Sequence, residues 1–291
     1  TDFEKAIRNN SSDIKIISRA KKLGFPDEII ANLSNKSNLE IRKFRIENGI
    51  VPVYKMVDTC AAEFEAVTPY FYSTYETENE AYPLKGKKAI VLGSGPIRIG
   101  QGIEFDYCSV HAAKALLKNN IKSIMINSNP ETVSTDFDIS DRLYVEPLDS
   151  ESVLDIIDNE NDTGIKKQKA QIPSIVQFGG QTAINLSQIL DQTNNPILGS
   201  SALSIDTASD RHLFEEFLSK TGVPNPPGGT VLTVEESIDI ANNLGYPVLV
   251  RPSYVLGGRA MEIVHNDTEL VNYMEKAIEA GSGKRILIDK Y

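Results

Sequence analysis

Two glycine-rich segments of this 291-residue chain are the features best suited to chemistry. The first, residues 93–100, follows an apolar run and precedes a helical pattern, where free backbone N–H groups favour an anion. Its spacing departs from the dinucleotide pattern G-x-G-x-x-G, because Arg98 stands where the third glycine is required and the next glycine is Gly100. The next apolar run ends on Asn127 and Asn129, with no carboxylate for a ribose hydroxyl. An NAD-dependent oxidoreductase is therefore an alternative that the spacing disfavours.

The second segment, residues 253–259, joins two short apolar runs and contains Gly257 and Gly258. This arrangement predicts a β-hairpin with the glycines at its tip. Backbone N–H groups of such a hairpin can cover the phosphates of ATP, as the glycine loop of a kinase does. A plain tight turn is the alternative interpretation of the hairpin taken alone.

Three further residues favour a nucleotide site at this hairpin. Arg251 directly precedes it and would place a fixed cation beside the phosphates. Arg211, at the start of a predicted helix, would reach the same pocket from another element. The apolar run that ends at Asp289 would offer its backbone to an adenine edge. The pattern G-x-x-x-x-G-K-S/T of a P-loop does not occur in the chain.

From Lys87 onward, apolar runs alternate with helical patterns, which is typical of a parallel sheet with crossover helices. A second unit begins after Pro224, and its sheet must be partly antiparallel because residues 252–259 are too short for a crossover helix. In the first unit we expect strands 89–92, 123–126, 143–145, 174–178 and 196–198, and helices 105–118, 150–159, 181–190 and 209–220. In the second we expect strands 247–251, 260–264 and 285–289, and helices 234–244 and 267–280.

The N-terminal part predicts three short helices: one from residue 14, capped by the 11–13 segment, one after Pro26, and one from about residue 38 to Gly49. Their lysines and arginines raise the alternative of a helix-turn-helix DNA reader. Interspersed acidic residues favour an ordinary solvated surface instead. The aromatic-rich residues 53–83 indicate a segment packed between two domains rather than a platform for stacked bases.

Composition excludes several classes of protein. With 41% hydrophobic and 24% charged residues the chain resembles ordinary globular domains, and a net charge of -10 disfavours general nucleic-acid binding. Cys60 and Cys108 are too few for a disulfide scaffold and lack zinc-site spacing, and no His lies near Cys60 to make it a nucleophile. No apolar run is long enough to cross a bilayer, so we expect a cytoplasmic protein with no membrane partner. Because Tyr291 directly follows a strand-like run, we expect the chain to be a piece of a longer polypeptide.

The chain resembles the large subunit of carbamoyl phosphate synthetase, from the last part of its oligomerisation domain into its carbamoyl-phosphate-forming half. The likeness is loose over the first fifty or so residues, and the polar stretch 159–171 is longer than in the family. The segments that carry the resemblance are residues 52–64, 72–76, 95–107, 129–136, 179–182 and 251–262.

The resemblance implies an α/β fold of three parts. Residues 1–84 would be the helical end of the oligomerisation domain and a connector, residues 85–205 a Rossmann-like pre-ATP-grasp domain with a parallel sheet, and residues 206–291 the incomplete first part of an ATP-grasp domain with a mixed sheet. It implies an ATP-dependent ligase that phosphorylates carbamate to carbamoyl phosphate for pyrimidine and arginine biosynthesis.

The resemblance also implies the site residues. Arg251 would have the catalytic role, and Arg211, Arg251, Gly257, Gly258, Asp289 and Lys290 would bind ATP, with Lys290 acting mainly through its backbone. Gly102, Asn129 and Thr135 would line the path of carbamate. The Mg²⁺ or Mn²⁺ ligands of the family would lie outside this chain, and no metal-binding residue is expected within it.

The implied partners are a glutaminase small subunit, which supplies ammonia, and further copies of the chain, bound through its N-terminal helical region. We expect the isolated chain to be inactive, since the resemblance places the metal-holding residues elsewhere. The alternatives are a non-catalytic oligomerisation or assembly module, and another ATP-grasp ligase.

Overall fold

The computed structural model describes residues 1–61, 63–64, 68–96, 102–161, 171–252, 261–281 and 285–291. The contacts divide the chain into two compact units, the first ending at Ala202 and the second beginning at Leu203. The polar stretch 162–170 and the expected hairpin 253–259 lie outside the described residues. Among the described residues, no helix combines the length and apolar character needed to span a membrane.

Four helices open the first unit: α1 (Asp2–Asn9), α2 (Ile14–Lys22), α3 (Asp27–Ser34) and α4 (Asn38–Glu47). Their facing sides bury a small core that includes Ile7, Ile17, Ile30 and Ile41. The three expected helices are confirmed. Helix α1 was missed, although its capping box, in which the Thr1 and Glu4 side chains each accept from the other's backbone, is a sequence signal for a helix start.

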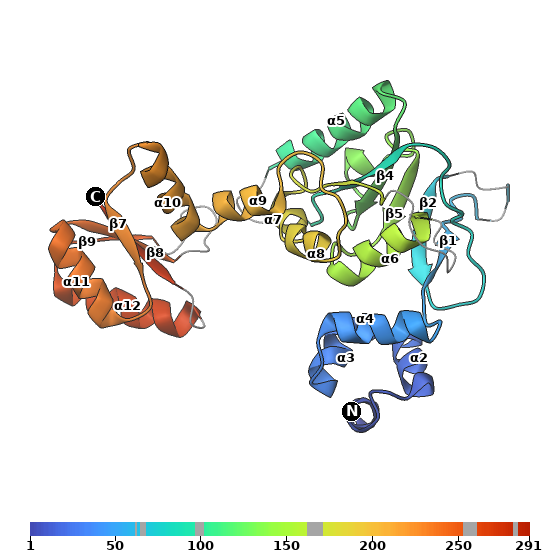
Figure 1. Ribbon diagram of the computed structural model, residues 1–291, viewed down its shortest axis with the longest axis horizontal. Coiled ribbons are helices and arrows are strands. Elements are labelled where there is room, and N and C mark those ends of the chain that lie inside the picture. Colours follow the sequence, from blue (N-terminus) through green and yellow to red (C-terminus); the bar gives the residue numbers. More distant parts are fainter. Residues whose placement is uncertain (62, 65–67, 97–101, 162–170, 253–260, 282–284) are drawn as a thin grey trace. The chain divides into compact units, whose positions relative to one another are not determined.

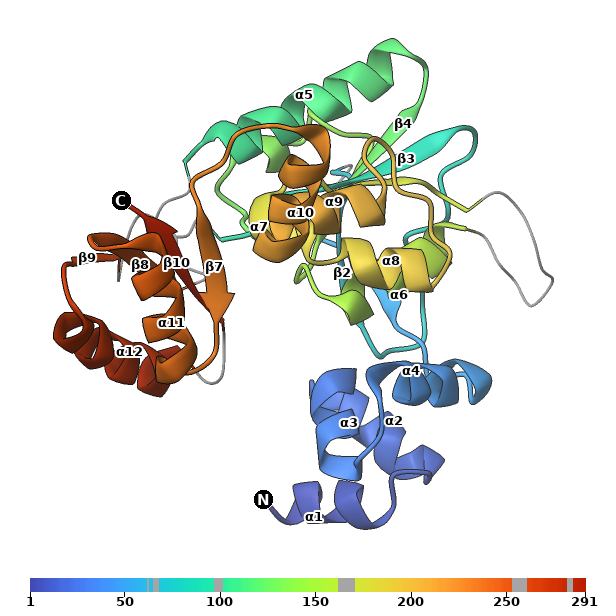
Figure 2. The same cartoon turned by 60° about the vertical axis from the view of Figure 1, so that its left-hand side comes forward.

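The sheet of the first unit has the strand order β1-β2-β5-β4-β3-β6, with β1 and β2 antiparallel and the other pairs parallel. Figures 1 and 2 show helix α5 (Glu104–Lys118) on one side of this sheet and α6 (Ser150–Glu160) and α8 (Ser187–Gln192) on the other. The strands are β1 (Val53–Met56), β2 (Tyr70–Thr74), β3 (Lys88–Leu92), β4 (Lys122–Asn127), β5 (Arg142–Val145) and β6 (Ser174–Ile175).

The aromatic-rich connector contributes β1 and β2 to this sheet, which the sequence did not predict. Tyr54 of β1 packs edge-on against Tyr144 of β5, with ring centroids 4.9 Å apart, and both rings are fully buried. The strands were missed because their stability comes from these partners across the sheet and not from a periodic pattern within the connector.

Three expected elements of the first unit are wrong in detail, and the first is the strand 174–178, of which β6 keeps only Ser174–Ile175. Instead of the strand 196–198, a single bridge joins Ile197 to Ser174, because β6 itself spans only two residues. The expected helix 181–190 is two helices, α7 (Gly180–Ile184) and α8, since the Leu186 N–H donates to Ala183 in a tighter turn.

Glu146, directly after β5, is expected to make the stability of the fold depend on pH. Its buried carboxylate accepts a hydrogen bond from the Ser73 N–H, but burial raises its pKa above the ordinary 4.5. The folded chain therefore binds this proton more tightly than the unfolded chain, so the free energy of unfolding falls as pH rises above that ordinary value. We expect urea titrations to show a larger free energy of unfolding for Glu146→Gln than for wild type near pH ~7. This difference in free energy should disappear on acidification to pH ~4. Glu76→Gln, at an exposed position, controls for the loss of one charge. A difference in the free energy of unfolding that grows on acidification would contradict the raised pKa of Glu146.

The second unit has a four-stranded sheet of order β7-β10-β8-β9, in which all three strand pairs are antiparallel. Helices α11 and α12 pack on it around Val250, Met274 and Ile288. The expected antiparallel pairing is confirmed, but the described strands form a wholly antiparallel sheet and not the expected mixed one. The elements are α9 (Ala202–Ser209), which leads into the unit, α10 (Arg211–Thr221), β7 (Gly228–Val231), α11 (Val234–Leu244), β8 (Val248–Pro252), β9 (Glu262–Val264), α12 (Asp267–Gly281) and β10 (Ile286–Lys290).

Strand β7 was also missed, because two glycines open it and glycine has low strand propensity. A Cβ at Gly228 would lie 2.4 Å from the Asp289 Oδ1 and 2.6 Å from the Ile288 carbonyl oxygen. Glycine therefore lets β7 approach β10 closely at the level of Asp289.

Candidate functional site

Arg251 and Asp289 form an ion pair on adjacent strands of the second unit. In the register of β8 and β10, Arg251 lies opposite Leu287 and Asp289 lies opposite Leu249. The Arg251 Nη2 donates to the Asp289 Oδ2 over 3.0 Å. The sequence placed both residues in one site, and the structure brings them together.

The Arg251 guanidinium keeps capacity for a further anion. Its side chain is 24% exposed, whereas that of Asp289 is 9% exposed. The buried Nε of Arg251 has no hydrogen-bond partner among the described residues. A guanidinium held by a strand and a carboxylate is a preorganised donor for phosphate oxygens.

Lys290 uses its side chain elsewhere. Its ammonium donates to the carbonyl oxygens of Gly245 (2.8 Å) and Tyr246 (3.3 Å), in the turn before β8. Its backbone N–H donates to the Pro227 carbonyl oxygen over 2.8 Å. The side chain therefore fixes the turn before β8.

The other predicted nucleotide-binding residues are only partly described. Arg211 is the first residue of α10, whose N-cap Asp210 accepts from the Leu213 N–H over 3.0 Å. Gly257 and Gly258 lie outside the described residues.

Two of the three residues predicted to line a carbamate path, Asn129 and Thr135, lie in the turn that follows β4 in the first unit. The Asn129 Oδ1 accepts from the Glu131 N–H over 3.1 Å, and the Thr135 Oγ1 donates to the Thr132 carbonyl oxygen over 2.7 Å. Asn129 and Thr135 thus belong to one turn, which ends in the short 3₁₀ helix η1 (Val133–Thr135). Gly102 lies just before α5, and its N–H donates to the Glu104 Oε1 over 3.1 Å.

Two buried polar residues that the sequence analysis did not select hold this turn in place. Asp106 of α5 accepts from the Ser134 N–H with both oxygens, at 3.2 and 3.3 Å, which ties the turn to the start of α5. Asn127, the last residue of β4, is fully buried and hydrogen-bonds to both this turn and the loop after β3. The available sequence signal was a polar residue that closes an apolar strand.

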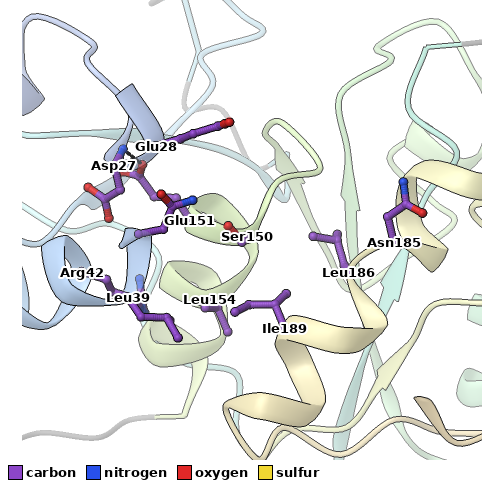
Figure 3. A pocket seen from close by; sticks show the side chains of 11 residues that line it. Asp27, Glu28, Leu39, Arg42, Ser150, Glu151, Leu154, Asn185, Leu186 and Ile189 are labelled. Atoms are coloured by element: carbon purple, nitrogen blue, oxygen red, sulfur yellow. Dashed lines mark hydrogen bonds between the residues drawn. The ribbon is translucent and has the colours of Figure 1, made fainter. Parts of the chain in front are cut away.

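A separate cavity of about 610 Å³ lies where α3 and α4 meet α6 and α8 (Figure 3). Three of its charged residues are engaged within the protein: the Asp27 N–H donates to the Glu151 Oε2 over 2.6 Å, and Arg42 pairs with Asp155 and Asp158. The cavity therefore belongs to the contact between the N-terminal helices and the sheet layer. It is lined by Asp27, Glu28, Asn38, Leu39, Arg42, Ser150, Glu151, Leu154, Asn185, Leu186 and Ile189.

Among the described residues, no group of three or more His, Cys, Asp or Glu side chains is arranged to hold a metal ion. We therefore assign no described residue to a metal site.

Two families match the chain. The family described as carbamoyl phosphate synthase preATP-grasp domain matches residues 85–207, and the carbamoyl-phosphate synthase L chain ATP binding domain matches residues 210–291. The carbamoyl phosphate synthase large chain of Thermomicrobium roseum is 55% identical over all 291 residues. The match covers 27% of that protein, so the chain spans about a quarter of the length of this relative.

Solved structures share the fold. The biotin carboxylase domain of the Hydrogenobacter thermophilus 2-oxoglutarate carboxylase, in complex with MgADP, ADP and bicarbonate, is 25% identical with a TM-score of 0.50, and the match covers 70% of this chain and 44% of that one. An N5-carboxyaminoimidazole ribonucleotide synthetase in its ADP complex is 12% identical with a TM-score of 0.51, over 72% of this chain and 48% of that one. These likenesses confirm the expected α/β class and the ATP-grasp relationship.

Proposed function

Because the chain belongs to the carbamoyl phosphate synthase large-chain family, we propose that it forms part of a site that phosphorylates carbamate with ATP. A carbamate oxygen would attack the γ-phosphorus as the bond to ADP breaks, leaving carbamoyl phosphate and ADP. In such a transfer the protein forms no covalent bond to the substrate. Its main tasks are to align the reacting groups and to neutralise the charge on the phosphates. The observation that carries the proposal is the Arg251 guanidinium, held at 3.0 Å by Asp289 within the ATP-binding domain match.

In this proposal the second unit binds the nucleotide. Arg251 lies against the phosphates, Arg211 and the N–H groups of Gly257 and Gly258 add further donors, and the backbone around Asp289 and Lys290 contacts the adenine. The ADP complexes of the biotin carboxylase domain and the ribonucleotide synthetase support a nucleotide on this fold. The MgADP of the former supports magnesium as the accompanying ion, with ligands outside the described residues.

The first unit would guide carbamate. The turn that contains Asn129 and Thr135 follows a parallel strand, and the carboxyl ends of such strands are where ligands bind in open α/β sheets. We place Gly102, before α5, on the same path. Ammonia would come from a separate glutaminase subunit, and the N-terminal helices would mediate self-association.

A chimera tests the proposal: this chain replaces the matching segment of the Thermomicrobium roseum large chain, and ATP-dependent carbamoyl phosphate formation is assayed with ammonia as nitrogen donor. We expect the chimera to form carbamoyl phosphate, and the isolated chain, as a control, to form none. A folded chimera with no turnover, beside an active parent, would contradict the proposed function.

A further inference from the structure

Asn127 is a buried amide whose bonds join two loops at the carboxyl end of the first unit's sheet. It ends β4 and is 0% exposed. Its Oδ1 accepts from the Gly95 N–H over 3.0 Å and from the Asn129 N–H over 3.3 Å. A buried side-chain amide is retained at low cost only when its donors and acceptors are satisfied, as they are here.

The other end of the same amide binds the turn. The Asn127 Nδ2 donates to the Ser134 Oγ over 3.1 Å and approaches the Thr132 Oγ1 at 3.5 Å. Because backbone N–H groups can only donate, the Gly95 and Asn129 bonds fix which end of the amide is oxygen. The nitrogen must therefore face the two hydroxyls.

Close packing leaves this amide one position. A Cβ at Gly93 would lie 2.6 Å from the Asn127 Cγ, so glycine is what allows the amide to lie against the loop after β3. On the far side, Asp106 fixes the Ser134 N–H from α5. The loop after β3, the turn after β4 and the start of α5 are thereby joined through one side chain.

We propose that Asn127 is a positioning residue for carbamate: it holds the Gly95 loop against the turn of Asn129 and Thr135, the turn to which the proposed function assigns carbamate. This inference rests on the proposed function. Asn127 acts through its neighbours, since it is fully buried and contacts no solvent.

Two substitutions separate the two ends of the amide. Asn127→Asp keeps an acceptor for the Gly95 and Asn129 N–H groups but loses the donor to Ser134, whereas Asn127→Ala loses both. Asn119→Ala is the control, because Asn119 is an exposed asparagine at the C-terminal end of α5 whose side chain donates one hydrogen bond, to the Ala115 carbonyl oxygen.

Hydrogen exchange in the isolated chain tests whether Asn127 fixes the Gly95 loop. We expect Asn127→Ala to speed exchange of the Gly95 amide about tenfold, and Asn127→Asp and Asn119→Ala to leave it within about threefold of wild type. Equal exchange at Gly95 in all four proteins would overturn the positioning role.

Kinetics of the chimera test the functional half, with ATP formation from ADP and carbamoyl phosphate as the assay. We expect both Asn127 variants to lower kcat/KM for carbamoyl phosphate about tenfold or more, with KM for ADP within about twofold. Equal losses for both substrates, or no loss, would overturn the inference. A wild-type chimera without activity would instead contradict the proposed function. The exchange experiment would still decide whether Asn127 holds the Gly95 loop in place.

Discussion

We expect Arg251→Met to lower kcat/KM for carbamoyl phosphate formation by the chimera about a hundredfold or more, because one preorganised donor to developing phosphate charge is removed. Asp289 already holds the guanidinium at 3.0 Å, so the side chain needs little rearrangement when the nucleotide binds. Arg251→Lys should recover only part of the loss, since an ammonium keeps the charge but not the planar fork of donors.

Loss of the Arg251–Asp289 pair could also weaken folding, and a matched control separates the two effects. Lys220→Met removes an exposed cation of α10 that pairs with Glu216 at 3.1 Å. We expect its activity to equal that of wild type. Thermal melts of all variants show whether each remains folded at the assay temperature. Full activity of Arg251→Met would show that Arg251 has no role in the nucleotide site.

The second large effect is on stability: Arg45→Met should lower the free energy of unfolding of the chain by about 3–5 kcal/mol, because it leaves two buried carboxylates with one cation each, Asp27 with Lys21 and Asp155 with Arg42. Arg45 is 0% exposed. Its Nε and Nη2 each lie 2.7 Å from an oxygen of Asp27, and its Nη2 lies 3.3 Å from the Asp155 Oδ2. Burial alone would lower the Arg45 pKa, but Asp155 and Asp27 raise it above its ordinary value, so the guanidinium stays charged.

This ion network connects the N-terminal helices to the sheet layer. Asp27 belongs to α3 and Asp155 to α6, and Lys21 of α2 pairs with Glu151 of α6. Urea titration followed by circular dichroism measures the expected loss. Lys43→Met is the control on the same helix, since Lys43 is exposed and lies 3.9 Å from Glu47, and we expect a change within about 0.5 kcal/mol. An Arg45→Met protein as stable as this control would show that the network does not stabilise the fold.

The sequence predicted those elements whose signal is local. Apolar runs alternating with helical patterns identified β3, β4 and β5 and the helices between them, and the short linker at residues 252–259 identified an antiparallel second sheet. Strands β1, β2 and β7 could not be found this way, since Tyr54 depends on Tyr144 and Gly228 on the approach of β10. Contacts between distant positions carry no local pattern, and Lys21 and Glu151 are 130 residues apart.

The candidate site shows the same division. Arg251 and Asp289 were selected separately, one for its place before a glycine segment and one for its place at the end of an apolar run. Their pairing at 3.0 Å follows from the register of β8 and β10, which the sequence does not determine. Lys290 was selected beside Asp289, but the fold uses its ammonium to fix the turn before β8. Asn127 was noted only as a polar strand end, because its four hydrogen-bond partners come from two loops.

Deuterium uptake of the chimera with and without ATP reports most directly where the nucleotide binds. We expect slower exchange in peptides that cover β8 and β10 when ATP is present, and we expect this protection to be lost in Arg251→Met. Protection confined to the loop after β3 and the turn after β4, with β8 and β10 unchanged, would contradict this expectation.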